Sequence, residues 1–428
     1  MNRTITKASA LKGELVVPAD KSISHRAIML GALSSGRSVV RNFLRAEDPI
    51  RTMNAFRSLG IAIADNGTEV VIDGKGIRGL READDIIDCG NSGTTMRLIS
   101  GVLAGNPFLS VLTGDASLRS RPMGRVIAPL REMGAGIFAR GGDKYAPMAI
   151  RGGALNPIDY ALPVASAQVK SCVLLASLAV EGVTRVIEPA ISRDHTERML
   201  KSMGADIVVG DQQVSLTGGR ELQPFDLTVP SDFSSAAFFM AASLIVPKSE
   251  IVLRGVGVNP SRTGMLDIIR RMGASCSLEN YRDVSGEPVA DIVCSAPDAL
   301  RPVSIGAGEV SCAIDEFPIL CILASQAEGT TSIRGAKELR VKESDRIAAM
   351  AQGLRSMGVA VEEFEDGMAV SGKAGLTGAE IESFHDHRIA MAFSVAGLIA
   401  EGQTTIRNAE CVDISFPGFY ELMGRLIR

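Results

Sequence analysis

The stretch "LKSMGADIVV" (residues 200–209) decides the fold, because close copies of it recur along the chain. The copies are "FRSLGIAI" (56–63), "LREMGAGI" (130–137), "IRRMGASCSL" (269–278), "LRSMGVAVEE" (354–363) and the truncated "YELMGRLI" (420–427). In each copy a helical pattern ends at a glycine, as is typical of a helix C-cap, and in most copies a strand pattern follows. The glycines are Gly60, Gly134, Gly204, Gly273, Gly358 and Gly424.

Two further elements precede each copy. A β-rich phrase such as "EGVTRVIEP" (181–189) predicts a strand, and an apolar run of helix length stands before it. These runs are apolar nearly all round, which indicates helices buried on every side. Each run opens at a residue type that can cap a helix. The openings lie near Ser22, Ser92, Ser166, Asp232, Asp315 and Asp386.

Six such repeats in 428 residues predict an α/β protein with two domains of three repeats each, with helices inside and sheets outside. The loop at 222–235 separates the third and fourth repeats. The N-terminal strand pattern precedes the first repeat, so we expect it to complete the other domain. We therefore expect a first domain at 19–228 and a discontinuous second domain formed by 1–18 and 229–428.

Composition argues against several classes of protein. A net charge of −4 does not favour nucleic acid or an anionic membrane as a partner. No run of 18 apolar residues predicts a membrane span, and the first residues do not resemble a secretory leader, so we expect a cytoplasmic protein. The seven cysteines are scattered without a CxxC pair, and only four histidines occur. We expect no metal site and seven small, buried thiols in a reducing compartment.

The segment at 338–358 reads as a helix whose first turn holds Lys342 and Arg346 on one face. Cations are disfavoured at the positive end of a helix dipole unless an anion binds there. Other predicted helix starts repeat this pattern. The cations at helix starts are Lys21, Arg26, Arg121, Lys342, Arg346 and Arg388.

Such a set could balance about two phosphates and a carboxylate. No GxxxxGK[ST] loop is present, so a nucleotide P-loop is not supported. Asp315 and Glu343 stand among the cations, where their pKa values should fall. The alternative is that Asp315 only caps a helix, that Lys342 pairs with Asp345, and that Arg346 is a solvated charge on the helix face. The pattern as a whole favours metal-free acid–base chemistry on phosphorylated substrates.

Six motifs together resemble the 3-phosphoshikimate 1-carboxyvinyltransferase (EPSP synthase) family over nearly the whole chain. The motifs are "DKSISHR" (20–26), "GNSGTTMRL" (90–98), "SRPM" (120–123), "SAQVKS" (166–171), "RVKESDR" (340–346) and "DHRIAM" (386–391). The resemblance implies two domains of three βαβαββ units, an inside-out α/β barrel, with the active site in the interdomain cleft. It also implies transfer of the enolpyruvyl group of phosphoenolpyruvate to the 5-hydroxyl of 3-phosphoshikimate, without a cofactor, through a non-covalent tetrahedral intermediate.

The resemblance further implies roles for individual residues. Asp315 would take the proton of the attacking hydroxyl, and Glu343, with Lys21, would handle the proton at the methylene carbon. The residues implied for 3-phosphoshikimate are Lys21, Ser22, Arg26, Ser166, Gln168, Arg193, Asp315 and Lys342. Those implied for phosphoenolpyruvate are Lys21, Gly93, Arg121, Gln168, Arg346 and Arg388.

Four positions depart from the family pattern. Ala167 replaces a serine, Arg193 stands where a tyrosine-type contact is common, Glu338 replaces an asparagine, and Ile414 replaces a lysine. Contacts from these places are open, and so is inhibitor sensitivity.

Two alternatives differ in what they require. The related enzyme that acts on UDP-N-acetylglucosamine usually carries a cysteine before the "RP" pair, and the loop at 113–123 has none. A ring or clamp that binds a polymer would need a basic face, which the net charge does not favour. We expect a monomer whose partners are small anionic substrates, with neither nucleic acid nor membrane.

Overall fold

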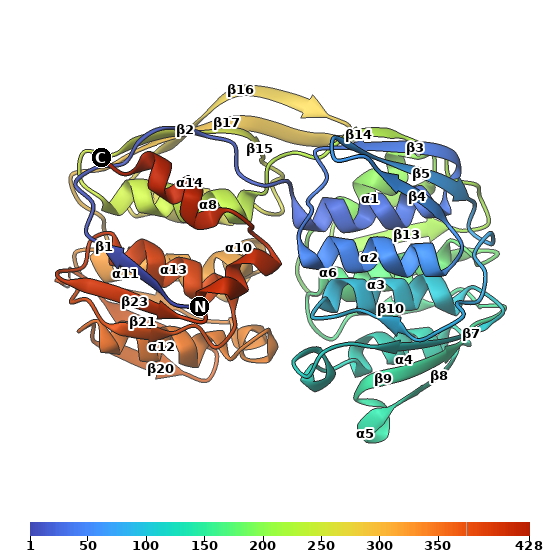
Figure 1. Cartoon of the computed structure of the whole chain (residues 1–428). Coiled ribbons are helices and arrows are strands. Elements are labelled where there is room, and N and C mark those ends of the chain that lie inside the picture. The colour runs from blue at the N-terminus through green and yellow to red at the C-terminus, as the bar shows by residue number, and fades with distance from the viewer. Residues whose placement is uncertain (374) are drawn as a thin grey trace. The chain divides into compact units, whose positions relative to one another are not determined.

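The computed structural model describes residues 1–373 and 375–428 and divides into two compact domains (Figure 1). The first domain comprises Ala19–Val229 together with Val284–Glu287. The second comprises Met1–Pro18, Pro230–Asp283 and Pro288–Arg428. Each domain has its own apolar core. The short return of the chain into the first domain at 284–287 lies at the turn of a hairpin, and the sequence pattern did not predict it.

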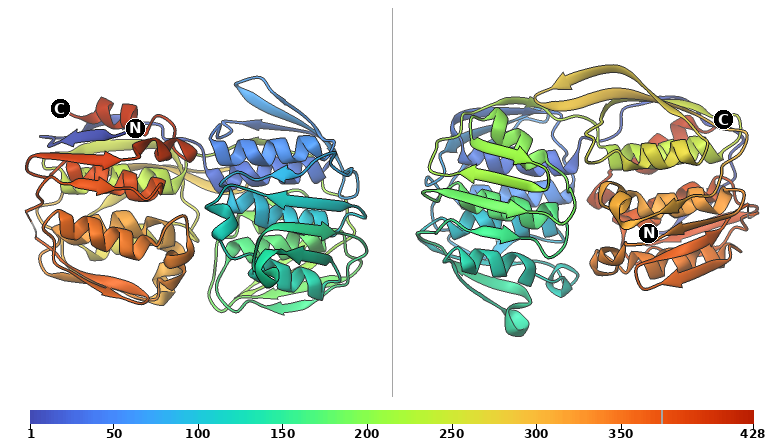
Figure 2. Two further views of the ribbon diagram at one scale, coloured as in Figure 1. Left: turned by 60° about the horizontal axis from the view of Figure 1, so that its bottom comes forward. Right: turned by 180° about the vertical axis from the view of Figure 1, so that it is seen from behind.

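Three apolar helices form the interior of the first domain, with sheets outside them (Figures 1 and 2). Every residue of α1 (Lys21–Leu33) from Ile23 to Leu33 is buried, as the all-round apolar pattern predicted. The helices α3 (Gly93–Ala104) and α6 (Ala167–Ser177) are buried in the same way. The more amphipathic helices are α2 (Glu47–Ser58), α4 (Gly124–Glu132) and α7 (His195–Ser202), and short turns form η1 (Leu118–Ser120) and α5 (Arg140–Asp143).

The described part of the first domain has three four-stranded sheets, ordered β14-β3-β5-β4, β6-β7-β9-β8 and β10-β11-β13-β12. In each sheet the first pair is parallel and the next two pairs are antiparallel, so the three repeats share one topology. The strands are β3 (Ser35–Arg41), β4 (Ala62–Asp65), β5 (Glu69–Lys75), β6 (Ile87–Asp88), β7 (Leu109–Thr113), β8 (Gly136–Ala139), β9 (Tyr145–Arg151), β10 (Asp159–Ala161), β11 (Val183–Ile187), β12 (Asp206–Gly210), β13 (Gln213–Thr217) and β14 (Asp226–Thr228).

The second domain repeats this plan around its own buried helices, which confirms the inside-out α/β arrangement (Figures 1 and 2). The buried helices are α8 (Phe233–Ile245), α11 (Phe317–Gln326) and α13 (His387–Gly397). The remaining helical segments are α9 (Gly264–Arg271), α10 (Ala307–Ala313), η2 (Ile314–Glu316), η3 (Lys337–Val341), α12 (Arg346–Ser356), η4 (Ala409–Ile414) and α14 (Phe419–Leu426).

The N-terminal strands belong to sheets of the second domain. The strand β2 pairs in parallel with β15, and β1 pairs antiparallel with β23. The described sheets are ordered β16-β17-β15-β2, β18-β19-β21-β20 and β1-β23-β22. The strands are β1 (Arg3–Thr6), β2 (Lys12–Leu15), β15 (Glu250–Gly257), β16 (Cys276–Val284), β17 (Glu287–Ser295), β18 (Ser304–Ile305), β19 (Thr330–Ile333), β20 (Val361–Phe364), β21 (Gly367–Ser371), β22 (Glu380–Glu382) and β23 (Gln403–Arg407).

The repeated glycine ends a helix in five of the six copies. Those five glycines have φ between 85° and 108°, the left-handed region that glycine adopts without strain. The truncated copy differs, because Gly424 lies inside α14. The prediction of a C-cap at Gly424 is therefore wrong, because α14 continues through this residue to Leu426.

Four predicted helix caps are confirmed and two are wrong. The side chains of Ser92, Ser166, Asp232 and Asp386 accept a backbone N–H of the helix that follows them. At α1 the cap is Asp20, whose Oδ1 accepts from the backbone N–H of Ile23 at 2.8 Å, so Ser22 lies inside the helix. At α11 the 3-10 turn η2 precedes the helix and contains Asp315, which is not the cap.

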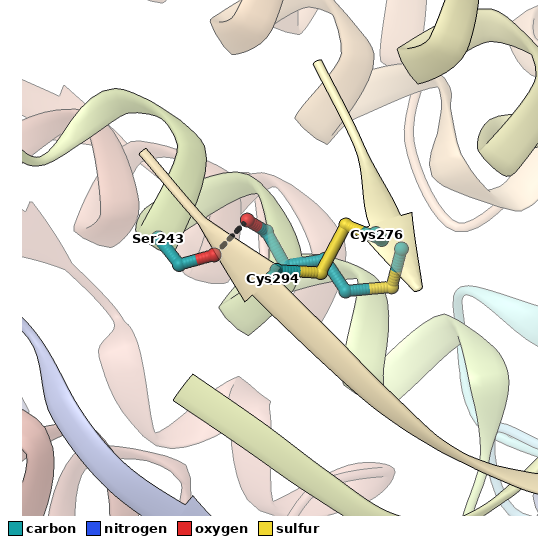
Figure 3. The surroundings of a disulfide bond; sticks show 4 residues. Ser243, Cys276 and Cys294 are labelled. Carbon is teal, nitrogen blue, oxygen red and sulfur yellow. Dashed lines mark hydrogen bonds between the residues drawn. A yellow bond between two sulfur atoms is a disulfide. The ribbon is translucent and has the colours of Figure 1, made fainter. Parts of the chain in front are cut away.

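The expectation of seven small, buried thiols is wrong for three of them. Cys276 and Cys294 form a disulfide across the neighbouring strands β16 and β17 (Figure 3). Two cysteines in facing strands can be bridged wherever their Cβ atoms approach, and spacing in the sequence cannot reveal this. Cys312 is half-buried, and the other free cysteines are buried. Burial raises the pKa of the Cys172 thiol to about 12, which makes that group unreactive.

Candidate functional site

The N-terminus of α3 is the first place where cations gather. Ser92 caps the helix, and Gly93 is its first residue. A Cβ added to Gly93 would lie 3.5 Å from Nη1 of Arg121 and 3.5 Å from Nη1 of Arg97. Two guanidinium groups therefore flank a helix end that already presents backbone N–H groups, an arrangement that favours an anion.

Two neutral side chains help to hold Arg121 in place. Its side chain is nearly buried, and its Nη2 donates to Oδ1 of Asn91 at 2.6 Å and to Oγ of Ser117 at 3.1 Å. Arg121 follows the turn η1 and does not begin a helix, so that part of the prediction is wrong. Its guanidinium nevertheless reaches a helix start, that of α3.

Gln168 also points to this helix end. Nη1 of Arg97 donates to Oε1 of Gln168 at 2.6 Å, and Nε2 of Gln168 donates to Oγ1 of Thr94 at 3.0 Å. Ser166 caps α6 by accepting from the backbone N–H of Val169 at 3.4 Å. The amide of Gln168 is thus fixed in orientation beside the two arginines.

Lys21 lies in the first turn of α1. Its Nζ is 3.2 Å from Oδ2 of Asp48, which is largely buried on α2. No sequence signal pointed to Asp48, because it stands in an ordinary acidic first turn of a surface helix. The ion pair fixes the lysine near the N-terminus of α1.

Arg26 lies one turn further along α1 and is 5% exposed. Burial and, to a smaller extent, the positive charge of Arg193 lower the pKa of its guanidinium to about 10, and Glu197 and Asp20 oppose this change. Arg26 therefore stays charged at neutral pH. The structure brings Arg193 close enough to Arg26 for the two charges to interact, which is unfavourable unless an anion joins them.

In the second domain, Arg346 lies close to three carboxylates. Its Nε donates to Oδ2 of Asp386 at 2.8 Å, and its Nη2 donates to Oε2 of Glu343 at 2.6 Å. Its Nη1 lies 3.6 Å from Oδ1 of Asp315. Burial opposes the charge of Arg346, but the three carboxylates outweigh burial and raise the pKa of the guanidinium.

Arg388 approaches Asp315 from α13. Its Nη1 donates to the backbone oxygen of Asp315 at 2.8 Å, and its Nη2 lies 3.8 Å from Oδ2. Asp386 caps α13 through the backbone N–H of Arg388 at 2.9 Å. Burial raises the pKa of Asp386, but Arg346 outweighs burial and holds that pKa below its usual value. Lowered pKa values for Asp315 and Glu343 stay predictions.

Lys342 does not lie where the helical pattern predicted it. The helix α12 begins at Arg346, with Asp345 as its cap, and Lys342 lies before it at the end of η3. The argument that Lys342 and Arg346 share a helix face is therefore wrong. The cap fixes the start because Oδ1 of Asp345 accepts from the backbone N–H of Ala348 at 3.0 Å.

Each domain thus collects part of the predicted set. In the first domain Gly93, Arg121 and Gln168 meet at the N-terminus of α3, and in the second Asp315, Glu343, Arg346 and Arg388 meet around one carboxylate–guanidinium cluster. Among the described residues, no group of three or more His, Cys, Asp or Glu side chains is arranged to hold a metal ion. The described helices are too short or too polar for any of them to span a bilayer.

Comparison with known proteins agrees with this geometry. The family model for EPSP synthase (3-phosphoshikimate 1-carboxyvinyltransferase) matches residues 5–423. A protein of Thermodesulfovibrio yellowstonii named 3-phosphoshikimate 1-carboxyvinyltransferase is 52% identical to this chain over 428 residues, which are all of both chains. A protein of Geobacter metallireducens with the same name is 54% identical over 423 residues, which cover 99% of this chain and 98% of the relative. A solved structure of EPSP synthase from Acinetobacter baumannii has a TM-score of 0.89 and 48% identity, and covers 100% of this chain and 98% of that one. The chain belongs to the EPSP synthase (3-phosphoshikimate 1-carboxyvinyltransferase) family.

Proposed function

We propose that this chain transfers the enolpyruvyl group of phosphoenolpyruvate to the 5-hydroxyl of 3-phosphoshikimate and releases phosphate. This is the reaction of its family and a step of aromatic amino-acid biosynthesis. Both substrates are small and multiply charged, so the reaction needs cations for binding and acid–base groups for proton transfer.

The cation cluster at the N-terminus of α3 carries the proposal. A glycine that leaves room beside two guanidinium groups and open helix N–H donors suits a phosphate or carboxylate. For phosphoenolpyruvate we propose contacts from Lys21, Gly93, Arg121, Gln168, Arg346 and Arg388. For 3-phosphoshikimate we propose contacts from Lys21, Ser22, Arg26, Ser166, Gln168, Arg193, Asp315 and Lys342.

The proposed chemistry is an addition followed by an elimination. In the addition, Asp315 accepts the proton of the 5-hydroxyl, the oxygen bonds to C2 of phosphoenolpyruvate, and C3 gains a proton to become a methyl group. In the elimination, C3 returns a proton, the double bond reforms and phosphate leaves from C2. Glu343 and Lys21 are the groups proposed for the proton at C3. Because the intermediate is not bound covalently, catalysis depends on positioning and on stabilising charge.

The location, the oligomeric state and the absence of a cofactor stay predictions. We expect the protein to act in the cytoplasm, as a monomer and without a cofactor. Arg193 is expected to meet the sugar phosphate in place of a tyrosine-type contact, because its charge already acts on Arg26. Substrate-binding measurements on variants of Ala167, Glu338 and Ile414 would show how these residues affect substrate contacts.

The test is acceptor-dependent release of phosphate. The protein is mixed with millimolar phosphoenolpyruvate and 3-phosphoshikimate, and phosphate and the new enol ether are followed by 31P and 1H NMR. Controls omit the acceptor or replace it with UDP-N-acetylglucosamine. Release that requires 3-phosphoshikimate supports the proposal. No release with it, or release only with UDP-N-acetylglucosamine, contradicts the proposal.

A further inference from the structure

Arg26 is buried, and each of its direct hydrogen-bond partners is neutral. Its Nε donates to Oγ1 of Thr196 at 2.7 Å, its Nη2 donates to Oγ of Ser171 at 2.9 Å, and its Nη1 donates to the backbone oxygen of Ser22 at 3.0 Å. By contrast, Arg346 contacts three carboxylates. Within the described chain Arg26 therefore has hydrogen-bonded oxygens but no ion pair.

A buried charge without an opposite charge is costly, so its retention needs a reason. The charges of Glu197, Asp20 and Glu287 act on Arg26 through space. The guanidinium has five N–H donors, and three are used inside the protein. One N–H on Nη1 and one on Nη2 are left, which is the pair that can bind two oxygens of one anionic group.

The two hydroxyls form a unit that fixes one edge of the guanidinium. Oγ of Ser171 and Oγ1 of Thr196 are 2.7 Å apart and hydrogen-bonded to each other, and both residues are buried. Nε and Nη2 of Arg26 lie on the same edge of the planar group, so two linked acceptors on that edge prevent it from turning. Serine and threonine hydroxyls suit this role because each can accept from Arg26 while one donates to the other.

An ion pair beside the hydroxyls holds the two helices that carry them. Lys170 precedes Ser171 on α6, and Glu197 follows Thr196 on α7. Nζ of Lys170 lies 2.6 Å from Oε1 of Glu197 and 2.7 Å from Oε2 of Glu188, and all three side chains are buried. The spacing between the two hydroxyls is therefore set by rigid neighbours.

We propose that Ser171 and Thr196 are positioning residues, whose paired hydroxyls orient Arg26 so that its two remaining N–H donors bind an anionic group of 3-phosphoshikimate. This inference rests on the proposed function, since it assigns Arg26 to that substrate. The hydroxyls themselves do not contact the reacting atoms. They act through the angle at which Arg26 presents its donors.

The test compares Thr196→Val with Thr196→Ser. Valine has nearly the same shape but no acceptor, and serine restores the hydroxyl. Thr184→Val is the matched control, because Thr184 is also fully buried in the first domain but its hydroxyl has no hydrogen-bond partner among the described residues. Calorimetric titration measures the Kd for 3-phosphoshikimate, and kinetics give kcat and both KM values.

We expect Thr196→Val to weaken 3-phosphoshikimate binding by about tenfold to a hundredfold, the range for loss of a hydrogen bond to a charged group. The KM for phosphoenolpyruvate should change by less than about twofold, and Thr196→Ser and Thr184→Val should bind 3-phosphoshikimate like the wild type. If Thr196→Val does not fold, Ser171→Ala is measured instead, because it removes the other acceptor. The same loss of affinity for 3-phosphoshikimate is then expected.

Wild-type affinity for 3-phosphoshikimate in Thr196→Val, or in Ser171→Ala where that variant decides, overturns the inference. An equal loss of affinity in Thr184→Val also overturns it, because the effect would then come from packing alone. Failure of the proposed function appears separately, as a wild-type protein that releases no phosphate from the two substrates.

Discussion

The ion pair between Arg346 and Asp386 should stabilise the second domain far more than a matched pair nearby. The side chain of Asp386 is fully buried, and that of Arg346 is 1% exposed. Asp386 also caps α13, and asparagine caps helices equally well. The exchange Asp386→Asn therefore keeps the cap and removes the negative charge.

The expected loss follows from what the variant leaves behind. Removing one partner of a buried ion pair costs about 3–5 kcal/mol, because the other charge stays buried. Glu343 still contacts Arg346 at 2.6 Å, so we expect the lower end, about 3 kcal/mol. Asp345→Asn is the control: Asp345 caps α12, and its pair with Arg340 is 38% and 24% exposed, so its loss should cost at most about 1 kcal/mol.

Urea unfolding measures the difference. The chain has no tryptophan, so far-UV circular dichroism is the signal. At a denaturant dependence of about 2 kcal/mol per molar urea, the two variants should differ by about 1 M in the midpoint of the affected transition. Equal midpoints for the two variants would refute the claim that burial gives the Arg346 pair its strength.

Three further predictions follow from single sites. Asp315→Asn should lower kcat by about 10²–10⁴-fold with nearly unchanged KM for phosphoenolpyruvate, and steady-state kinetics check this; full turnover would remove Asp315 as the base. Burial holds the pKa of His25 well below 6.5, so this side chain stays neutral in the folded protein. The free energy of unfolding should therefore fall as pH drops below about 6.5, by at most about 1.4 kcal/mol per pH unit from this group. Urea unfolding of His25→Gln should show a shallower fall with pH, and a slope identical to that of the wild type would contradict this prediction. Denatured, unreduced protein should show five thiols and not seven, and Cys276→Ser should cost about 3 kcal/mol for the 18-residue separation to Cys294; seven thiols would contradict the disulfide.

The architecture was predictable because its signals are periodic and local. Apolar residues on every face of 27–33 and 236–244 can only be satisfied inside a core, and both segments are buried helices. A glycine such as Gly204 marks a helix end because its φ of 85° is strained for other residues. The prediction failed at Gly424, because similar residues surround it but α14 continues through it to Leu426.

Pairings between distant residues were not predictable. Lys21 and Asp48 are 27 positions apart, and only the packing of α1 against α2 brings them together. The disulfide depends on the facing of β16 and β17, which spacing does not encode. Lys342 was misplaced because a polar cap three residues later competes for the helix start.

The balance of charge was also only partly predicted. Counting cations at helix starts predicted positive groups that are placed to bind an anionic ligand. In the second domain Arg346 and Arg388 both lie against carboxylates, whereas Arg26 in the first domain is surrounded by neutral oxygens. Residue type alone cannot separate these cases, because the difference lies in which neighbours the fold supplies.

The most direct test of the account is a single reaction run in D2O with phosphoenolpyruvate and 3-phosphoshikimate. If C3 is protonated and then deprotonated, the transient methyl group takes up deuterium from solvent, and the vinyl signals of the product should lose intensity in the 1H NMR spectrum. A product whose vinyl group carries no deuterium would contradict addition followed by elimination. Formation of pyruvate, with phosphate moved to the acceptor, would contradict enolpyruvyl transfer itself.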